Sequence, residues 1–298
     1  HRWRRKRRCG VGRRQRASGI RLVGGVRHVQ KGRRCGADFP GSYPAAPMTN
    51  TSAPFDKLSI FYPMWNEEEY IGRTLSAAHE AGRSLISVGE IADYEILIID
   101  DASTDSTPQQ ADEAAANDSR VRVVHHPKNR KLGGSIKTGF ANVTGDLVLY
   151  TDADLPFDMV ELQKACRLMR QYEADIISAY RLDRTGEGYV RTVYSFFYNA
   201  LVRVFFGLKM RDVNFAFKMC RGRIFEHISL KSEGSFIDAE LVIRANKLGY
   251  HIVQFGVDYF PRTRGVSTLS SPGVIVKILK EMRELRQELR AIEPLVNK

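Results

Sequence analysis

The stretch YEILIIDDASTDST, residues 94–107, decides the fold that we predict for this chain of 298 residues. Its first part, Tyr94–Ile99, is apolar apart from one glutamate, and a short apolar run between polar segments is typical of a strand buried on both faces. Its second part begins with Asp100 and Asp101 and continues with Ser, Thr and Asp, which favours a polar loop leading into a helix at Pro108. The stretch therefore predicts a strand, a loop and a helix in succession.

Apolar runs of the same kind recur before and after this stretch. The strands that they predict are Lys57–Pro63, Arg120–His125 and Leu147–Thr151. The helical spacing of Ile71, Leu75 and Ala78 predicts a helix after the first strand. Asn66 is the expected N-cap of that helix. Strands that alternate with helices form βαβ units, so we predict an α/β fold with a mostly parallel central sheet flanked by helices.

Acidic residues follow the carboxyl ends of two predicted strands. They are Asp100, Asp101, Asp152 and Asp154. In open parallel sheets, ligands bind in the crevice at this edge. Asp152 and Asp154 can converge on one divalent cation if the backbone turns between them, and their hard oxygens suit Mg²⁺ or Mn²⁺. The alternative is that both are loop acids or helix caps, because Asp-x-Asp is a common pattern.

The positive charge of the chain is concentrated near its amino terminus. The formal net charge is +12, but residues 1–47 carry fourteen Lys and Arg and one acid, which leaves residues 48–298 with a net charge of −1. We therefore expect no nucleic-acid partner for the folded part. The Arg/Gly-rich segment Trp3–Arg34 is predicted to be disordered. It is either a basic arm that meets anionic lipid or nucleic acid, or sequence upstream of a native start at Met48.

Cysteine and histidine usage favours neither a zinc site nor a disulfide framework. The cysteines are Cys9, Cys35, Cys166 and Cys220. They form no CxxC pair, which fits a reducing compartment. The adjacent His125 and His126 are interpreted as ordinary surface or packing residues. The longest uncharged apolar run, Thr192–Val202, has eleven residues, which is too short for a membrane-spanning helix of about 20 residues.

Four motifs follow one another along the chain. They are YPMWNEEEYI (62–71), IIDDASTDST (98–107), NRKLGGSIKTGF (129–140) and TDADLPFD (151–158). In this order and at this spacing they resemble the nucleotide-sugar half of the inverting family-two glycosyltransferases, which have the GT-A fold with a Rossmann-like sheet. Within that group the chain most resembles the polyprenyl- or dolichyl-phosphate mannose or glucose synthases. Later segments agree: SAYR (178–181), RDVNFAFK (211–218), SFIDAELVIRANKLGY (235–250) and PRTRGVST (261–268).

The resemblance implies a UDP- or GDP-sugar as donor and assigns residues to its binding. Those residues are Pro63, Trp65, Glu67, Asp100, Asp101, Lys131 and Asp152. The family usually has tyrosine where this chain has Trp65, and either ring can stack on a base. Gly133 and Gly134 precede a helical stretch and would let the backbone approach a phosphate.

The resemblance also implies that Asp152 and Asp154 act in catalysis by holding Mg²⁺ or Mn²⁺ against the diphosphate. In the closest relatives, a glutamine two positions after the second aspartate supplies a third ligand. This chain has Pro156 there, which offers no side-chain ligand. Water or the donor would therefore complete the coordination.

The nature of the acceptor decides which further residues are needed. A lipid phosphate is already anionic and needs residues that hold phosphate, whereas a sugar hydroxyl needs a base. The resemblance offers for phosphate Arg181, Arg191, Ser195, Lys218 and Arg262. Asp238 and Glu240 are the candidate bases. We expect metal-dependent, inverting transfer of a hexose to a polyprenyl (dolichyl or undecaprenyl) phosphate, with a hydroxyl of a glycan or glycolipid as the alternative acceptor.

Two apolar segments indicate contact with a membrane or with other helices. Tyr189–Leu208 is rich in Phe and Tyr with flanking Arg, which is typical of a helix in the bilayer interface but also of a core or dimer helix. Val274–Leu289 predicts an amphipathic helix for packing, pairing or surface attachment. We predict a tail over 1–53, a glycosyltransferase domain over 54–272 and a C-terminal helix over 273–298. The expected location is cytoplasmic, attached peripherally to the cytoplasmic face of the membrane, and a homodimer is left open.

Overall fold

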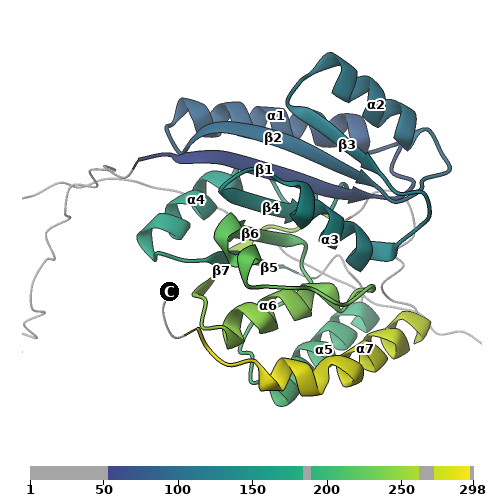
Figure 1. Ribbon diagram of the computed structural model, residues 1–298, viewed down its shortest axis with the longest axis vertical. Coiled ribbons are helices and arrows are strands. Elements are labelled where there is room, and N and C mark those ends of the chain that lie inside the picture. Colours follow the sequence, from purple (N-terminus) through teal and green to yellow (C-terminus); the bar gives the residue numbers. More distant parts are fainter. Residues whose placement is uncertain (1–52, 184–188, 262–271, 296–298) are drawn as a thin grey trace, which may run out of the picture. The chain divides into compact units, whose positions relative to one another are not determined.

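A mixed sheet of seven strands forms the centre of the computed structural model, which describes residues 53–183, 189–261 and 272–295 (Figure 1). The strands are β1 (Phe55–Met64), β2 (Ile91–Asp100), β3 (Val121–His125), β4 (Leu147–Thr151), β5 (Ile176–Arg181), β6 (Phe217–Arg221) and β7 (Ile252–Val257). They lie in the order β3-β2-β1-β4-β6-β5-β7. All neighbours pair in parallel except β6, which is antiparallel to both β4 and β5. The predicted α/β fold with a mostly parallel sheet is confirmed.

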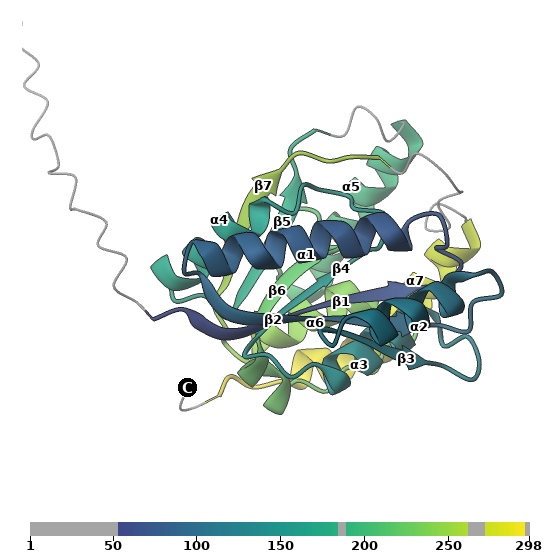
Figure 2. The same cartoon turned by 90° about the horizontal axis from the view of Figure 1, so that it is seen from above.

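Helices cover both faces of this sheet (Figure 2). They are α1 (Ile71–Ser87), α2 (Thr107–Asn117), α3 (Lys131–Asn142), α4 (Glu161–Gln171), α5 (Tyr189–Phe206), α6 (Ile237–Lys247) and α7 (Pro272–Ala291), with a short 3-10 helix at Gly222–Glu226. Helices α1 and α4 pack on one face through side chains such as Leu85 and Leu162. Helices α3 and α6 pack on the other through Ile136 and Ile237. Because both faces are covered, the central strands are nearly continuous apolar runs.

The predicted start of α1 is wrong. Asn66 is the N-cap expected from the sequence, but α1 begins at Ile71 and Tyr70 occupies the N-cap position. Asn66 has a φ of 55°, in the left-handed region, and its side-chain oxygen accepts a hydrogen bond from the Thr104 backbone N–H at 2.8 Å. The asparagine therefore joins two loops instead of starting a helix.

The C-terminal helix α7 packs on α5 and α6. Ile278, Met282 and Leu289 of α7 are buried in one apolar cluster with Val202 and Phe206 of α5. Of the three roles predicted for this amphipathic helix, packing is the one that the structure shows. None of the described helices combines the length and the apolar character needed to cross a membrane.

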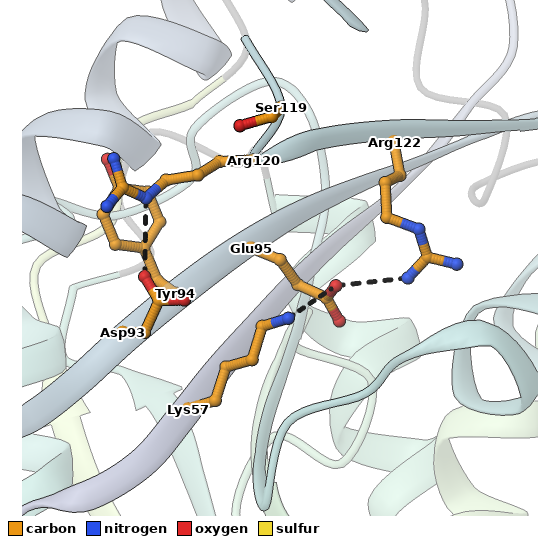
Figure 3. Close-up of a pocket in the computed structure, with 7 residues that line it drawn as sticks. All are labelled: Lys57, Asp93, Tyr94, Glu95, Ser119, Arg120 and Arg122. Carbon is orange, nitrogen blue, oxygen red and sulfur yellow. Dashed lines mark hydrogen bonds and ion pairs between the residues drawn. The ribbon is translucent and has the colours of Figure 1, made fainter.

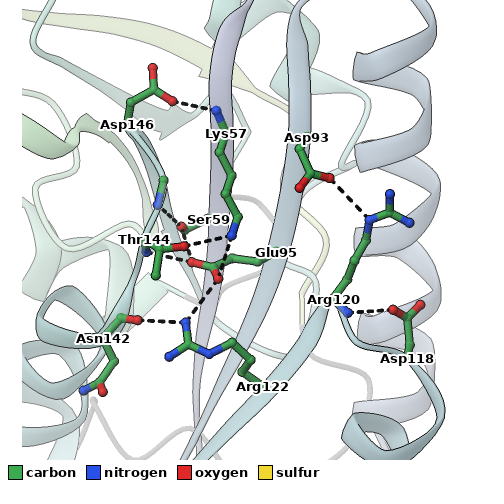
Figure 4. Close-up of polar contacts among 11 residues, drawn as sticks. Lys57, Ser59, Asp93, Glu95, Asp118, Arg120, Arg122, Asn142, Thr144 and Asp146 are labelled. Atoms are coloured by element: carbon green, nitrogen blue, oxygen red, sulfur yellow. Dashed lines mark hydrogen bonds and ion pairs between the residues drawn. The ribbon is translucent and has the colours of Figure 1, made fainter.

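Glu95 on β2 is a buried carboxylate that joins three strands and a loop (Figure 4). Its Oε1 accepts hydrogen bonds from Ser59 Oγ at 2.6 Å and from the Thr144 backbone N–H at 2.8 Å. Its Oε2 accepts from Lys57 Nζ at 3.2 Å and from Arg122 Nη1 at 3.1 Å. The carboxylate therefore connects β1, β2 and β3 with the segment that leads into β4.

A hollow of about 350 Å³ lies beside Glu95 (Figure 3). Its lining residues are Lys57, Asp93, Tyr94, Glu95, Ser119, Arg120 and Arg122. Arg120 pairs with Asp93 at 3.4 Å, while Lys57 and Arg122 both pair with Glu95. Cations and carboxylates compensate one another here, so we interpret the hollow as part of the scaffold.

The hydrogen bonds to Glu95 make its contribution to stability depend on pH. Burial alone would raise its pKa, but hydrogen bonds from Ser59, Thr144 and Lys57 outweigh burial and lower the pKa from 4.5 to about 2. A carboxyl with a lowered folded-state pKa stabilises the fold above its unfolded-state pKa. That contribution is therefore lost as the pH falls from about 4.5 towards 2.

We expect Glu95→Gln to lower the free energy of unfolding at pH 7 by about 1–3 kcal/mol, because an amide cannot accept all four hydrogen bonds. Urea unfolding at pH 7 measures this loss, and the difference from the natural chain should shrink as the pH approaches 2. Asp93→Asn is the control, since its ion pair with Arg120 is about half exposed and should contribute less than about 1 kcal/mol. Equal losses in the two variants would contradict a special role for Glu95.

Candidate functional site

The carboxyl ends of β1, β2 and β4 bring several predicted site residues to one edge of the sheet. In the pairing of β1 with β2, Met64 lies opposite Asp100, and the Asp101 backbone N–H donates to the Met64 carbonyl at 2.9 Å. Strand β4 pairs in parallel with the other side of β1 and ends at Thr151, directly before Asp152. The structure therefore has the sheet edge at which the acidic residues were predicted to lie.

The loops after β1 and β2 are joined at this edge by hydrogen bonds between side chains and backbone. The Glu67 backbone N–H donates to Thr107 Oγ1 at 2.9 Å. The Glu68 carboxylate accepts from the backbone N–H and the hydroxyl of Ser106 at 2.9 and 2.7 Å. Trp65, at the start of the first loop, is 51% exposed. The two loops are therefore held together by hydrogen bonds, and the exposed Trp65 ring lies at the start of the first loop.

Asp100 and Asp101 are buried and bind the two adjacent histidines at the end of β3. One Asp100 oxygen lies 2.9 Å from His125 Nδ1, and one Asp101 oxygen lies 2.6 Å from His126 Nδ1. The Asp101 carboxylate also accepts from the Arg130 backbone N–H at 2.7 Å. Each histidine is thus hydrogen-bonded to a buried carboxylate, which the interpretation as ordinary surface or packing residues did not include. The sequence signal for these two contacts was the position of the residues, because two acids end one strand and two histidines end its parallel neighbour.

The glycines of α3 make room for parts of the protein. A Cβ at Gly133 would lie 2.4 Å from the Ser232 carbonyl oxygen, and the Gly133 N–H donates to the Glu233 carbonyl at 3.1 Å. A Cβ at Gly134 would lie 2.4 Å from the Arg130 Cβ. The structure thus explains both glycines by close packing, and the approach of a phosphate to this backbone stays a prediction.

Asp152 and Asp154 are both half-buried after β4, and Asp154 lines a cleft of about 500 Å³ beside α1. Within the described ranges, no group of three or more His, Cys, Asp or Glu side chains is placed to hold a metal ion. Pro156 is buried, and its carbonyl accepts from the Phe260 backbone N–H at 3.0 Å. Two carboxylates on one short loop, one of which lines a cleft, fit a divalent cation whose other ligands are water and phosphate.

A buried lysine and a buried aspartate lie near these carboxylates. Lys218 on β6 lies opposite Tyr150 of β4, and its Nζ donates to the Phe215 carbonyl at 2.5 Å. Asp238 on α6 is 5% exposed, and its Oδ1 has no hydrogen-bond partner in the described part of the chain. Burial raises the pKa of Asp238 to about 6 against the opposing effect of Lys218, and burial lowers the pKa of Lys218. Asp238 can therefore exchange a proton close to neutral pH.

Two other predicted site residues form ion pairs or hydrogen bonds that hold the fold. Arg181 contacts both carboxylate oxygens of Asp212, with Nε to Oδ2 at 2.6 Å and Nη2 to Oδ1 at 2.5 Å. Glu240 is fully buried and accepts from the backbone N–H groups of residues 231 and 232. Since Glu240 fixes this loop, Asp238 is the stronger candidate of the two predicted bases.

The remaining predicted residues lie in different settings. Pro63 is half-buried at the end of β1, Ser195 is half-buried on α5, and Lys131 is exposed at the start of α3. The side chain of Arg191 and the whole of Arg262 lie outside the described residues. The structure therefore brings the ends of β1, β2 and β4 to one edge of the sheet, while the assignment of residues to donor and acceptor stays a prediction.

Comparison with known proteins identifies relatives over much of the chain. Residues 59–232 match the model of Glycosyl transferase family 2. Glycosyltransferase AglD of Haloferax volcanii is 31% identical over 211 residues, which make up 69% of this chain and 33% of AglD. Dodecaprenyl-phosphate galacturonate synthase of Rhizobium johnstonii is 24% identical over 253 residues, which make up 82% of this chain and 72% of that protein. The chain thus spans about a third of the length of AglD.

Solved structures share the arrangement of the sheet and helices. Glucosyl-3-phosphoglycerate synthase of Mycobacterium tuberculosis, in complex with Mn²⁺, UDP-glucose and phosphoglyceric acid, has a TM-score of 0.55 at 19% identity over 76% of this chain and 79% of that one. Mannosyltransferase PcManGT of Pyrobaculum calidifontis, in complex with GDP-Man and Mn²⁺, has a TM-score of 0.55 at 16% identity over 81% and 69%. These likenesses show the fold, and the family match covers more than half of the chain, from β1 past β6. The chain therefore has the GT-A fold and belongs to glycosyl transferase family 2.

Proposed function

We propose that this chain transfers a hexose from a UDP- or GDP-sugar to a polyprenyl phosphate, with inversion at the anomeric carbon. The observation that carries the proposal is the shared edge of β1, β2 and β4, where an exposed tryptophan, two joined loops and two neighbouring carboxylates lie together. The similarity to a dodecaprenyl-phosphate galacturonate synthase supports a lipid phosphate as the acceptor.

The donor would lie across the loops that follow β1 and β2. Trp65 and Pro63 would pack against the base, and Lys131, exposed at the start of α3, would compensate the charge of the diphosphate. Asp100 and Asp101 are buried, so we assign them the task of fixing the loops that contact the donor. The solved neighbours bind UDP-glucose in one case and GDP-Man in the other, which leaves both bases in the proposal.

Asp152 and Asp154 would hold Mg²⁺ or Mn²⁺, as their oxygen ligands and their position beside a cleft allow. Both solved neighbours named above contain Mn²⁺. When bound, the ion would compensate the charge that develops on the departing diphosphate. Because Pro156 supplies no third side chain, we expect the ion and the diphosphate to bind together.

A phosphate acceptor needs charge compensation and orientation, because it is already ionised at pH 7. Its oxygen would form a bond to the anomeric carbon while the bond to the nucleoside diphosphate breaks on the opposite side. The residues that we propose for the acceptor or donor phosphates are Arg181, Arg191, Ser195, Lys218 and Arg262. Lys218 is fully buried and Arg181 is paired with Asp212, so both would act mainly through their charge and through the strands that they hold.

Asp238 supports a second candidate function, in which the acceptor is a sugar hydroxyl. A hydroxyl must lose its proton as it attacks, and a base works best when its pKa lies near the working pH. Burial raises the pKa of Asp238 to about 6, and its Oδ1 has no partner in the described structure. In this candidate the proton of the hydroxyl passes to Asp238.

The exposed aromatic side chains of α5 support peripheral attachment to the cytoplasmic face of a membrane. Phe196 and Phe197 are 69% and 59% exposed, although other side chains of the same helix are buried against α6 and α7. Aromatic residues on one side of a packed helix suit the bilayer interface, where a polyprenyl phosphate is held. A second copy of the chain is the alternative partner for this surface.

Incubation of the chain with Mg²⁺ or Mn²⁺, polyprenyl phosphate and a panel of UDP- and GDP-sugars should give one charged glycolipid that mild acid cleaves. Asp152→Asn should lower turnover by about 100-fold or more, because it removes a carboxylate from the site of charge development. Asp56→Asn, an exposed acid on β1, is the matched control and should stay active. Absence of transfer from every donor would contradict the proposal.

Asp238→Asn separates the two acceptor classes. With a hydroxyl acceptor the variant should lose about 100-fold or more in kcat, and the kcat of the natural chain should fall below pH 6 as the base becomes protonated. With a phosphate acceptor the variant should lose much less in kcat, and the kcat of the natural chain should not fall below pH 6. Steady-state kinetics with both acceptors decide the question, and near-normal turnover of the variant on a hydroxyl would exclude Asp238 as the base.

Replacing Phe196 and Phe197 together by serine should weaken binding to anionic lipid vesicles by about tenfold or more, because each phenyl ring contributes apolar area to the interface. Vesicle sedimentation measures the change. Val160→Ser is the control, since Val160 is 63% exposed but lies before α4. Equal binding by all three proteins would remove α5 as the attachment surface.

A further inference from the structure

Two consecutive histidines at the end of β3 face two consecutive aspartates at the end of β2. His125 Nδ1 lies 2.9 Å from Asp100 Oδ2, and His126 Nδ1 lies 2.6 Å from Asp101 Oδ1. The Asp100 and Asp101 side chains are only 3% and 5% exposed, and His126 is buried as well, whereas the His125 side chain is 38% exposed. The register of the sheet sets this arrangement, because Asp100 and His125 are paired residues of β2 and β3.

The second nitrogen of each imidazole reaches a helix beside the two strands. His125 Nε2 lies 3.0 Å from Asp112 Oδ1 on α2, the helix after β2. His126 Nε2 lies 2.9 Å from Thr138 Oγ1 on α3, the helix after β3. Each histidine therefore joins a strand end to a helix, and the two together span α2, β2, β3 and α3.

The partners of the two histidines impose different protonation states. A carboxylate can only accept, so both contacts of His125 are satisfied together only by the charged ring, which donates from both nitrogens. His126 faces one carboxylate and one hydroxyl, and a neutral ring satisfies both because the hydroxyl can donate. The pKa of His125 is raised by its hydrogen bonds to Asp100 and Asp112, which outweigh burial. The charged groups that face it are Asp100 from β2 and Asp112 from α2.

The aspartates held by the histidines also hold the donor-side loops. Asp100 Oδ1 accepts from the Ser103 backbone N–H at 3.0 Å, and Ser103 Oγ accepts from the Asn66 backbone N–H at 3.0 Å. Asp101 accepts from the Arg130 backbone N–H, one residue before α3. A change at His125 can therefore reach the loop after β2 through two hydrogen bonds and the loop after β1 through a third.

We propose that His125 and His126 are positioning residues for the nucleotide sugar, and that the charged form of His125, held between Asp100 and Asp112, keeps the donor loops in the binding conformation. This inference rests on the proposed function, because it requires the donor to lie on these loops. When His125 loses its proton, one carboxylate loses its hydrogen bond and Asp100 loses the compensating charge. Donor affinity then falls as the pH rises.

The first measurement is the protonation of His125 itself, by two-bond ¹H–¹⁵N NMR on the full chain. We expect the charged form of His125, with protons on both ring nitrogens, to persist to higher pH than in an ordinary histidine. Asp112→Asn should lower the pKa of His125, because it removes one facing carboxylate. Glu113→Gln, which neutralises the next exposed acid on α2, is the matched control and should leave the titration unchanged.

The second measurement is the KM for the nucleotide sugar between pH 6 and 8.5, with Mg²⁺ present. We expect KM to rise about fivefold as His125 loses its proton, with a smaller change in kcat. Asp112→Asn should move this rise to lower pH, and Glu113→Gln should not. Binding linkage is reciprocal, so UDP-glucose or GDP-mannose with Mg²⁺ should raise the proton affinity of His125 by the same factor in the NMR titration.

The outcomes separate this inference from the proposed function. If the role of His125 is purely structural, Asp112→Asn should be less stable, but the pH dependence of the donor KM should be the same as in the natural chain. That result would overturn the inference while transfer activity stands. A donor KM that is constant across this pH range would do the same. If the natural chain binds no nucleotide sugar at any pH, the proposed function fails, and the inference fails with it.

Discussion

The parallel pairing of β2, β1 and β4 is the constraint on which the candidate site depends. Parallel strands end on the same side of a sheet, so the residues that follow them meet without any long-range sequence signal. The pairing places Met64 opposite Asp100 and ends β4 directly before Asp152. The one antiparallel strand, β6, then brings Lys218 beside Tyr150 and extends the polar region towards α6. The positions of the candidate site residues are therefore a consequence of strand register.

The buried polar groups Glu95 and Asp238 differ in how their oxygens are hydrogen-bonded. The Glu95 cluster satisfies every oxygen of a buried carboxylate and binds the strands together, which is the arrangement expected of a scaffold. Asp238 has an oxygen with no partner in the described structure and a pKa raised to about 6 by burial. An unmet hydrogen bond is costly in the interior, and this is why we propose Asp238 as the base of the second candidate function.

Much of the fold and part of the site follow from the sequence. The strands β1 to β4, the mostly parallel sheet and the shared edge of the acids were predictable, because a buried strand needs a continuous apolar run, whereas β5, β6 and β7 were not predicted. Asn66 was misread because an asparagine can cap a helix or adopt positive φ, and only the opposite loop decides between the two. The packing role of Gly133 and the pairs of His125 and His126 depend on contacts between distant segments, which local patterns do not encode.

The central claim is that two carboxylates after β4 and the loops after β1 and β2 form one donor site. Titration of Mn²⁺ into the chain, followed by electron paramagnetic resonance with and without UDP or GDP, tests it most directly. The account predicts weak binding of Mn²⁺ alone, because Asp152 and Asp154 have no third side-chain ligand from Pro156, and binding at least about tenfold tighter with the nucleotide. Mn²⁺ binding that ignores the nucleotide would contradict the account.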